Sequence, residues 1–177
     1  SSLNWEAVPW DNKVLIPDPV NREVLPFKLR KRARVFLHNA GHGGYMGACG
    51  TQEFLQAIPL VKSNVKFIIN SQVPLPHLKD PRAEVRVVNY KYYWQLYQEG
   101  DVYVEPLKFR ATSLPIQEAM SRGMAIICSN IKPFNEFLPA ELLIKPQKTI
   151  KIKVKREIDY HILDPKDIAE KIDEIAN

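Results

Sequence analysis

The 177-residue chain has few of the features that mark secreted, membrane or metal-binding proteins. Its two cysteines, Cys49 and Cys128, lie far apart and form no CxxC pair, so we expect no disulfide framework and a reducing, cytoplasmic setting. No apolar run reaches the roughly 18 residues that a membrane span needs. The first residues lack the basic and apolar regions of a secretory signal peptide. The four histidines have no acidic or cysteine partner at ligand spacing, so no metal is expected.

The composition is that of an ordinary globular protein. Apolar residues make up 45% of the chain and charged residues 25%, which excludes disorder, collagen and coiled coil. The length suits one domain, which would bury roughly 70% of the surface of the unfolded chain. The chain starts with Ser1 rather than methionine, which fits a piece of a longer protein.

The positive charge is confined to two segments. The formal net charge is +5, yet residues 28–34 carry five basic side chains and residues 145–156 carry six, with no acid in either. The rest of the chain has 14 basic against 20 acidic side chains. The two segments fit either a solvated loop and a lysine-guarded edge strand, or a surface for phosphates and anionic lipid. They lack interleaved aromatic residues, which makes nucleic acid an unfavoured partner.

The order of expected elements indicates the α/β class. Residues 1–34 hold four prolines and are expected to form an extended lead-in with a short strand near 14–16, followed by one domain over 35–177. In that domain, short apolar strands alternate with helices, which predicts βαβ units and a parallel sheet. Residues 149–162 alternate at period two and predict an extra hairpin or edge strand. The expected strands are 35–38, 65–70, 85–88, 102–105, 125–128 and 142–145, and the expected helices are 51–61, 92–98, 116–122 and 165–176.

A glycine-rich loop follows the first expected strand. Residues 39–50, NAGHGGYMGACG, contain five glycines and lead into a helix. Glycines there would let the backbone approach an anion, and the start of a helix offers N–H donors. The spacing fits neither a Walker A loop nor GxGxxG, so a plain flexible connection is the alternative.

A second candidate is the loop and helix at 106–124, PLKFRATSLPIQEAMSRGM. Backbone amides of residues 111–114 could meet a phosphate, with Lys108 and Arg110 adding positive charge beside them. Glu118 is suited to a sugar cis-diol, because an ionised carboxylate accepts hydrogen bonds at both oxygens. The alternative is an ordinary solvated glutamate.

The stretch from Asp101 to Phe137 resembles the C-terminal half of retaining glycosyltransferases of the GT-B fold, the group with glycogen-synthase-like enzymes and mannosyltransferases. Further back, GTQEFLQAI (50–58), VKFIIN (65–70) and VLIPDPVN (14–21) are similar to segments of the same half, so the resemblance covers roughly residues 14–146. Within the first stretch it rests on Asp101, Pro106, Ser113–Leu114, Glu118–Met120, Gly123, Ala125–Ile127 and Glu136.

The resemblance implies a Rossmann-like parallel sheet with helices on both faces, one half of a GT-B enzyme. This half binds a nucleotide-diphosphate sugar as donor substrate, without a metal or other cofactor. The implied partners are a missing N-terminal domain and an acceptor, which is a glycan, a lipid or a protein. Peripheral contact with a membrane is compatible with this.

The resemblance also assigns roles to residues. It implies that Glu118 holds the ribose hydroxyls and that two loops contact the diphosphate or the sugar. The nucleobase is then expected near the end of the third strand. The residues are Gly41, Gly43 and Gly44 in the first loop, Thr112, Ser113 and Leu114 in the second, and Asn89 and Tyr90 at the base.

Three charged positions of the family are changed. The first glutamate of its Glu-x7-Glu pair falls on Arg110, and the arginine and lysine that neutralise the diphosphate fall on His42 and Cys49. We expect Lys108 and Arg110 to supply the missing charge and to act catalytically, by stabilising the departing diphosphate. The alternatives are a degenerate, non-catalytic domain that serves binding or assembly, and a basic module for membranes or nucleic acid.

Overall fold

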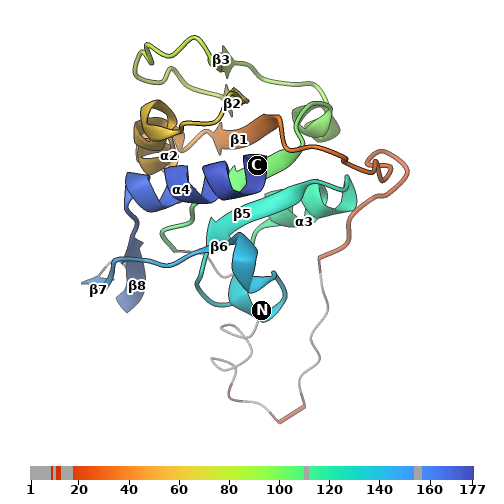
Figure 1. Ribbon diagram of the computed structural model, residues 1–177. Helices are drawn as coiled ribbons and strands as arrows, with labels where there is room; N and C mark the ends of the chain where they lie inside the picture. The colour runs from red at the N-terminus through yellow and green to blue at the C-terminus, as the bar shows by residue number, and fades with distance from the viewer. Residues whose placement is uncertain (1–8, 10, 13–17, 110–111, 154–156) are drawn as a thin grey trace.

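The computed structural model describes residues 9, 11–12, 18–109, 112–153 and 157–177. Six parallel strands form one sheet in the order β3-β2-β1-β4-β5-β6 (Figure 1). This is the strand order of a Rossmann-like domain, which confirms the expected α/β class. The strands are β1 (Val35–Gly41), β2 (Lys66–Ser71), β3 (Ala83–Val87), β4 (Val102–Glu105), β5 (Ala125–Ser129) and β6 (Leu143–Ile144).

The strand order reverses direction between β1 and β4. From β1 the chain winds outward to β2 and β3, then returns to place β4 on the other side of β1. The loops after β1 and β4 therefore diverge at the carboxyl edge of the sheet. In open α/β sheets, ligands bind outside the carboxyl ends of the strands at such a reversal.

Helices cover both faces of the sheet, as expected. On one face, α2 (Thr51–Ala57) and α4 (Pro165–Ala176) pack on Phe36 and Phe67. On the other face, α3 (Leu114–Ser121) and the 3-10 helix η3 (Tyr93–Tyr97) pack on Leu37 and Ile68. Successive strand residues point to opposite faces, so each buried strand supplies both cores.

Most expected elements are present, with shifts at their ends. The strand at 102–105 and the helix at 165–176 have the expected bounds. The expected helix at 51–61 ends in a 3-10 turn, η2 (Ile58–Leu60), where Pro59 removes a backbone donor. The aromatic segment at 92–98 forms a 3-10 helix rather than an α-helix. The strand expected near 14–16 lies outside the described residues.

The period-two segment forms a separate antiparallel pair, β7 (Lys148–Lys153) with β8 (Glu157–Ile162), set apart from the main sheet in Figure 1. Tyr160 of β8 packs on Phe109, with ring centroids 5.9 Å apart. The His161 amide donates to the Lys108 carbonyl at 2.8 Å. The pair is therefore an outlying ribbon that attaches to the loop after β4.

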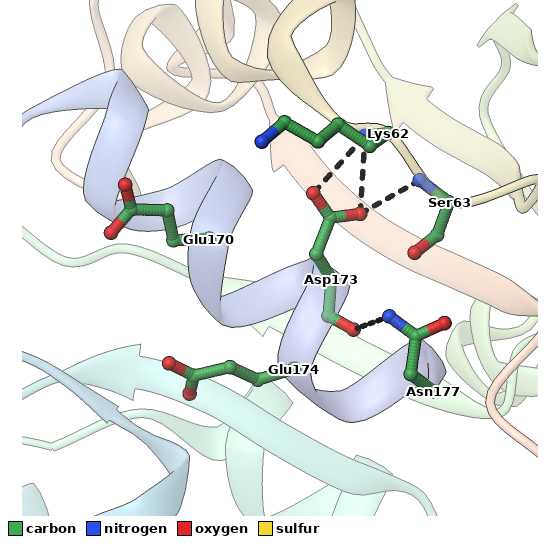
Figure 2. Close-up of a pocket in the computed structure, with 6 residues that line it drawn as sticks. All are labelled: Lys62, Ser63, Glu170, Asp173, Glu174 and Asn177. Carbon is green, nitrogen blue, oxygen red and sulfur yellow. Dashed lines mark hydrogen bonds between the residues drawn. The ribbon is translucent and has the colours of Figure 1, made fainter.

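The last helix is fixed at both ends by side-chain carboxylates. Asp164 caps its start by accepting from the Lys166 amide at 2.9 Å. Asp173 accepts from the amides of Lys62 at 3.1 Å and Ser63 at 2.8 Å, beside a surface pocket that Figure 2 shows. Burial raises the pKa of Asp173, but the hydrogen bonds from Ser63 and Lys62 outweigh burial and leave it below its usual value.

We predict that Asp173→Ala lowers the free energy of unfolding by about 1–3 kcal/mol, because two backbone amides lose a charged acceptor. Glu170→Ala is the matched control, since Glu170 lines the same pocket but is exposed. Urea unfolding of both variants measures the difference. Equal losses in the two variants would contradict the anchoring role of Asp173.

Candidate functional site

The loops after β1 and β4 are packed against each other at the reversal point. Gly50 has φ +70°, and a Cβ there would collide with the Pro106 carbonyl. The Lys108 amide donates to the Ala48 carbonyl at 2.9 Å. The close approach requires glycine at position 50, both for the left-handed backbone and for the missing side chain.

Two of the three glycines predicted at the diphosphate have left-handed backbones. Gly41 has φ +59° at the end of β1, and a Cβ there would meet no atom within 4 Å. Gly44 has φ +54° and starts the short 3-10 turn η1 (Gly44–Met46), packed on Val73. Gly43, between them, is exposed. The open space beside Gly41 lies at the carboxyl end of β1.

The second predicted loop is held by a buried carboxylate. Ser113 is the N-cap of α3, where its Oγ accepts from the Ile116 amide at 3.4 Å. The same hydroxyl donates to Glu105 Oε2 at 2.7 Å. Glu105 ends β4 and is 1% exposed. Sequence reasoning missed Glu105 because a lone acid at a strand end carries no motif.

The other residues predicted in this loop lie at the surface or outside the described residues. Leu114 begins α3 and is exposed. The Thr112 hydroxyl donates to Asp18 at 3.1 Å, which connects the loop to the lead-in segment. Arg110, predicted as catalytic, lies outside the described residues, so its role stays a prediction.

Glu118 lies in the second turn of α3 and is half-buried. The Tyr97 hydroxyl of η3 donates to Glu118 Oε2 at 2.6 Å. Burial raises the pKa of Glu118, and the bond from Tyr97 opposes that rise. Burial also raises the pKa of Tyr97, so its hydroxyl keeps its proton and remains the donor. Tyr97 thus fixes the carboxylate that was predicted to hold ribose.

A cavity of about 240 Å³ opens at the carboxyl ends of β1, β2 and β3. It brings Gly41 and Tyr90 together, two residues predicted for different parts of one ligand. Asn89, predicted beside Tyr90, is exposed and does not line the cavity. The further lining residues, which sequence reasoning missed, are Asn39, Asn70, Ser71, Gln72, Val88, Tyr93 and Leu96.

Lys108 has a partner within the protein. It is 3% exposed, and its Nζ lies 2.9 Å from Glu53 Oε1. Burial lowers the pKa of Lys108, but the bond to Glu53 outweighs it and the pKa is raised. The ammonium also lies 6.0 Å from the centroid of the Tyr160 ring. Glu53 therefore neutralises the charge that was predicted for a diphosphate, and a catalytic role for Lys108 stays a prediction.

The two positions where the family has an arginine and a lysine differ in exposure. His42 is exposed on the glycine-rich loop. Cys49 is buried, with its Sγ 3.7 Å from the Ala40 carbonyl. A cysteine buried in this way cannot replace the positive charge of a lysine.

Side chains of the two basic segments form hydrogen bonds and ion pairs within the protein. Arg30 Nε donates to the Gly100 carbonyl at 3.1 Å, at the amino-terminal edge of the sheet. Lys151 on the ribbon pairs with Glu157 at 3.0 Å and Asp159 at 3.5 Å. A membrane contact through these segments stays a prediction. In the described parts of the chain, no helix is long and apolar enough to cross a membrane.

A family model described as "Glycosyl transferases group 1" matches residues 40–177, which include the site residues described above except Asn39. The chain belongs to this family. The expected resemblance is thereby confirmed over all of the described sheet except the first residues of β1. No cluster of three or more potential metal ligands occurs among the described residues.

Two solved glycosyltransferases have a similar fold. The apo lipopolysaccharide outer core galactosyltransferase WaaB matches with TM-score 0.59 and 13% identity, over 86% of this chain and 42% of its own. The catalytic domain of the cholesterol-alpha-glucosyltransferase from Helicobacter pylori matches with TM-score 0.53 and 17% identity, over 81% of this chain and 86% of its own. This chain thus spans less than half of the galactosyltransferase. A sequence search of curated proteins found no match.

A buried histidine of β1 connects this strand to β4 and to α2. His38 is fully buried, with Nδ1 2.8 Å from the Val104 carbonyl and Nε2 2.9 Å from the Thr51 hydroxyl. A carbonyl only accepts, so Nδ1 carries the proton and Nε2 accepts from Thr51. Burial lowers the pKa of His38 from 6.5 to about 4, against the effect of the Val104 bond.

We predict that acid destabilises the protein through His38. Between pH 6.5 and about 4, His38 binds a proton in the unfolded chain but stays neutral in the folded chain. The free energy of unfolding therefore falls as the pH drops. The loss reaches about 3 kcal/mol by pH 4, at 1.36 kcal/mol per pKa unit. Urea unfolding at pH 7 and pH 4.5 measures it, with His38→Gln as the non-titrating reference. An equal pH dependence in both proteins would overturn the assignment.

Proposed function

We propose that this domain binds the nucleoside diphosphate part of a nucleotide-sugar donor, for transfer of the sugar to an acceptor. The observation that carries the proposal is the half-buried Glu118, held by Tyr97 next to the strand-order reversal. Membership of the group 1 glycosyltransferases supports it. The nearby cavity at the ends of β1 to β3 offers space for the rest of a nucleoside.

In the proposed complex, Glu118 accepts hydrogen bonds from the two ribose hydroxyls. An ionised carboxylate has room for these in addition to the bond from Tyr97, because its two oxygens offer about four acceptor sites. The diphosphate then lies toward the reversal point, where the glycines of the β1 loop and the amides at the start of α3 are available.

Sugar transfer breaks the bond between the anomeric carbon and a diphosphate oxygen and forms one to an acceptor hydroxyl oxygen, whose proton passes to the departing diphosphate. The electron pair of the broken bond leaves with the diphosphate, so groups that stabilise this charge accelerate the reaction. Backbone amides of the glycine-rich loop and of Ser113 and Leu114 are proposed for this task, with Arg110 as the predicted cation. The acceptor and its binding domain are proposed to lie beyond this chain.

A non-catalytic role is the second candidate. The observations that favour it are the burial of Cys49 at a family lysine position and the pairing of Lys108 with Glu53. Both remove positive charge from the diphosphate, which would slow transfer more than it weakens nucleoside binding. Turnover of a donor by the longer protein would exclude this candidate.

We predict that the domain binds UDP or GDP and that Glu118→Ala weakens this binding about tenfold to a hundredfold. Hydrogen bonds to a charged group contribute about 1.5–3 kcal/mol, which corresponds to that range. Isothermal titration calorimetry measures the change. Gln117→Ala is the matched control, because Gln117 lines a different hollow with Phe27 and Met120. Unchanged affinity in the Glu118 variant would refute the ribose role.

We also predict that nucleotide affinity falls on acidification at a pH above the ordinary glutamate range. The pKa of Glu118 is raised, and its protonated form loses acceptor capacity for the ribose. Glu118→Gln removes this titration while the phosphates of the ligand still titrate, so the difference between the two pH profiles isolates Glu118. Parallel profiles for wild type and variant would contradict the prediction.

A further inference from the structure

Two asparagines lie side by side at the inner end of the cavity. Asn39 of β1 and Asn70 of β2 are partners in the strand register, near the carboxyl ends of both strands. Each follows by two residues a core residue of the α3 face, Leu37 and Ile68, so both side chains lie on that face. Both line the cavity together with Tyr90 and Tyr93.

The Asn70 side chain is buried without a full set of partners. It is 3% exposed, and its Nδ2 donates to Asn39 Oδ1 at 3.0 Å. Its Oδ1 has no hydrogen-bond partner among the described residues. A buried acceptor left unpaired costs about 1–3 kcal/mol. Such a group at the wall of a cavity is explained if a ligand supplies the missing donor.

The charge of Glu118 sets the direction of the hydrogen bonds here. An ionised carboxylate only accepts, so the Tyr97 hydroxyl donates its proton to Glu118 and its oxygen is left to accept. Burial raises the pKa of Tyr97, and the Asn39 amide opposes part of that rise, as an N–H donor near the phenol oxygen would. The Asn39 Nδ2 makes no hydrogen bond of standard geometry, so this contact is weaker than the others.

These donor and acceptor roles determine the orientation of the side-chain amides of Asn39 and Asn70. If Nδ2 of Asn39 faces Tyr97, its Oδ1 faces Asn70 and accepts from Nδ2 of that residue. The acceptor that remains is Asn70 Oδ1, on a residue that lines the cavity. The result is a chain of polar groups that starts at a carboxylate and ends in an acceptor, which would bind an N–H group of a ligand.

The cavity walls fit a planar ring. Val88, Leu96 and the half-buried Tyr90 contribute apolar surface, and Tyr93 adds a second aromatic ring. Aromatic side chains stack on the faces of nucleobases without preference for one base. Discrimination between bases then depends on polar groups at the ring edge, and Asn70 supplies one.

We propose that Asn70 is a specificity-determining residue that reads the nucleobase of the donor, its Oδ1 accepting an N–H from the base edge while the ring contacts Tyr90 and Tyr93. This inference rests on the proposed nucleotide-sugar function. It adds that a side chain at the end of β2, connected to Glu118 through Asn39 and Tyr97, selects the base.

The test combines a change in the protein with a change in the ligand. Calorimetry with UDP, GDP, ADP and CDP first identifies the preferred base. The preferred ligand is then compared with analogues in which a methyl group replaces the base-edge N–H. They are N3-methyl-UDP, N1-methyl-GDP and N2,N2-dimethyl-GDP, N6,N6-dimethyl-ADP, and N4,N4-dimethyl-CDP. We expect methylation to weaken binding to the wild type at least tenfold and to change binding to Asn70→Ala less than threefold.

Two further variants keep the test decisive. Asn70→Ser provides a hydroxyl as donor to Asn39 but removes the amide oxygen proposed to bind the base, so methylation should change its binding less than threefold, as with Asn70→Ala. It serves as the test if the alanine variant fails to fold. Gln117→Ala is the matched control, because Gln117 is an amide that lines a different hollow and should keep the wild-type response to methylation.

The outcomes separate this inference from the proposed function. If none of the four diphosphates binds the wild type, the proposed function and this inference both fail. If one binds in a Glu118-dependent way but the Asn70 variants discriminate against the methylated analogue as the wild type does, only the reading of the base by Asn70 is overturned.

Discussion

The packing of two loops at the strand-order reversal is the constraint on which the site depends. Gly50 lies directly against Pro106, and the amide of Lys108 bonds to the carbonyl of Ala48. Beneath them, His38 bridges Val104 of β4 and Thr51 of α2. Each contact joins the β1 side of the sheet to the β4 side. The carboxyl edge at the reversal is therefore assembled by tertiary contacts, and a side chain at position 50 would disturb both the loop after β1 and the loop after β4.

The ribbon of β7 and β8 also contacts the loop after β4. Tyr160 covers Lys108 and Phe109, and His161 bonds to the backbone of Lys108. The loop after β4 is thus held on one side by α2, through Glu53, and on the other by β8. A lysine enclosed in this way serves chiefly to position the loop, whatever it contributes to the charge at a diphosphate.

Sequence patterns predicted the fold well because periodic burial determines it. The strand at 102–105 and the helix at 165–176 were predicted with correct bounds, since an apolar run and a complete cap signal define them. The 3-10 form of 93–97 was not predicted, because five residues do not distinguish i→i+3 from i→i+4 bonding. The strand order required tertiary information, which no local pattern carries.

The site could be predicted only in part. Glu118 and the glycines belong to motifs, and the structure places them at the expected edge. Glu105, Asn39 and Asn70 have no motif, and their importance comes from burial and from partners distant in sequence. The ion pair of Lys108 with Glu53 joins residues 55 positions apart, so no local pattern could reveal that its charge is already used.

The polar groups of the sheet are paired unevenly within the protein. At the amino-terminal edge they are satisfied internally: Asp101 accepts from the amides of Arg34 and Val35, and Arg82 donates to the carbonyls of Ile58, Val61 and Ser63.

Five buried polar side-chain atoms of the described residues lack a hydrogen-bond partner within the protein. They are Asn39 Nδ2, Glu53 Oε2, Asn70 Oδ1, Tyr103 OH and Ser129 Oγ, four of them on β1, β2, β4 and β5 and the fifth in the first turn of α2. Asn39, Asn70 and Ser129 lie at or near the carboxyl ends of their strands, the edge at which we propose that the donor binds. Leaving a buried acceptor such as Asn70 Oδ1 unpaired costs about 1–3 kcal/mol, and the proposed nucleotide sugar would offset this cost by supplying an N–H donor.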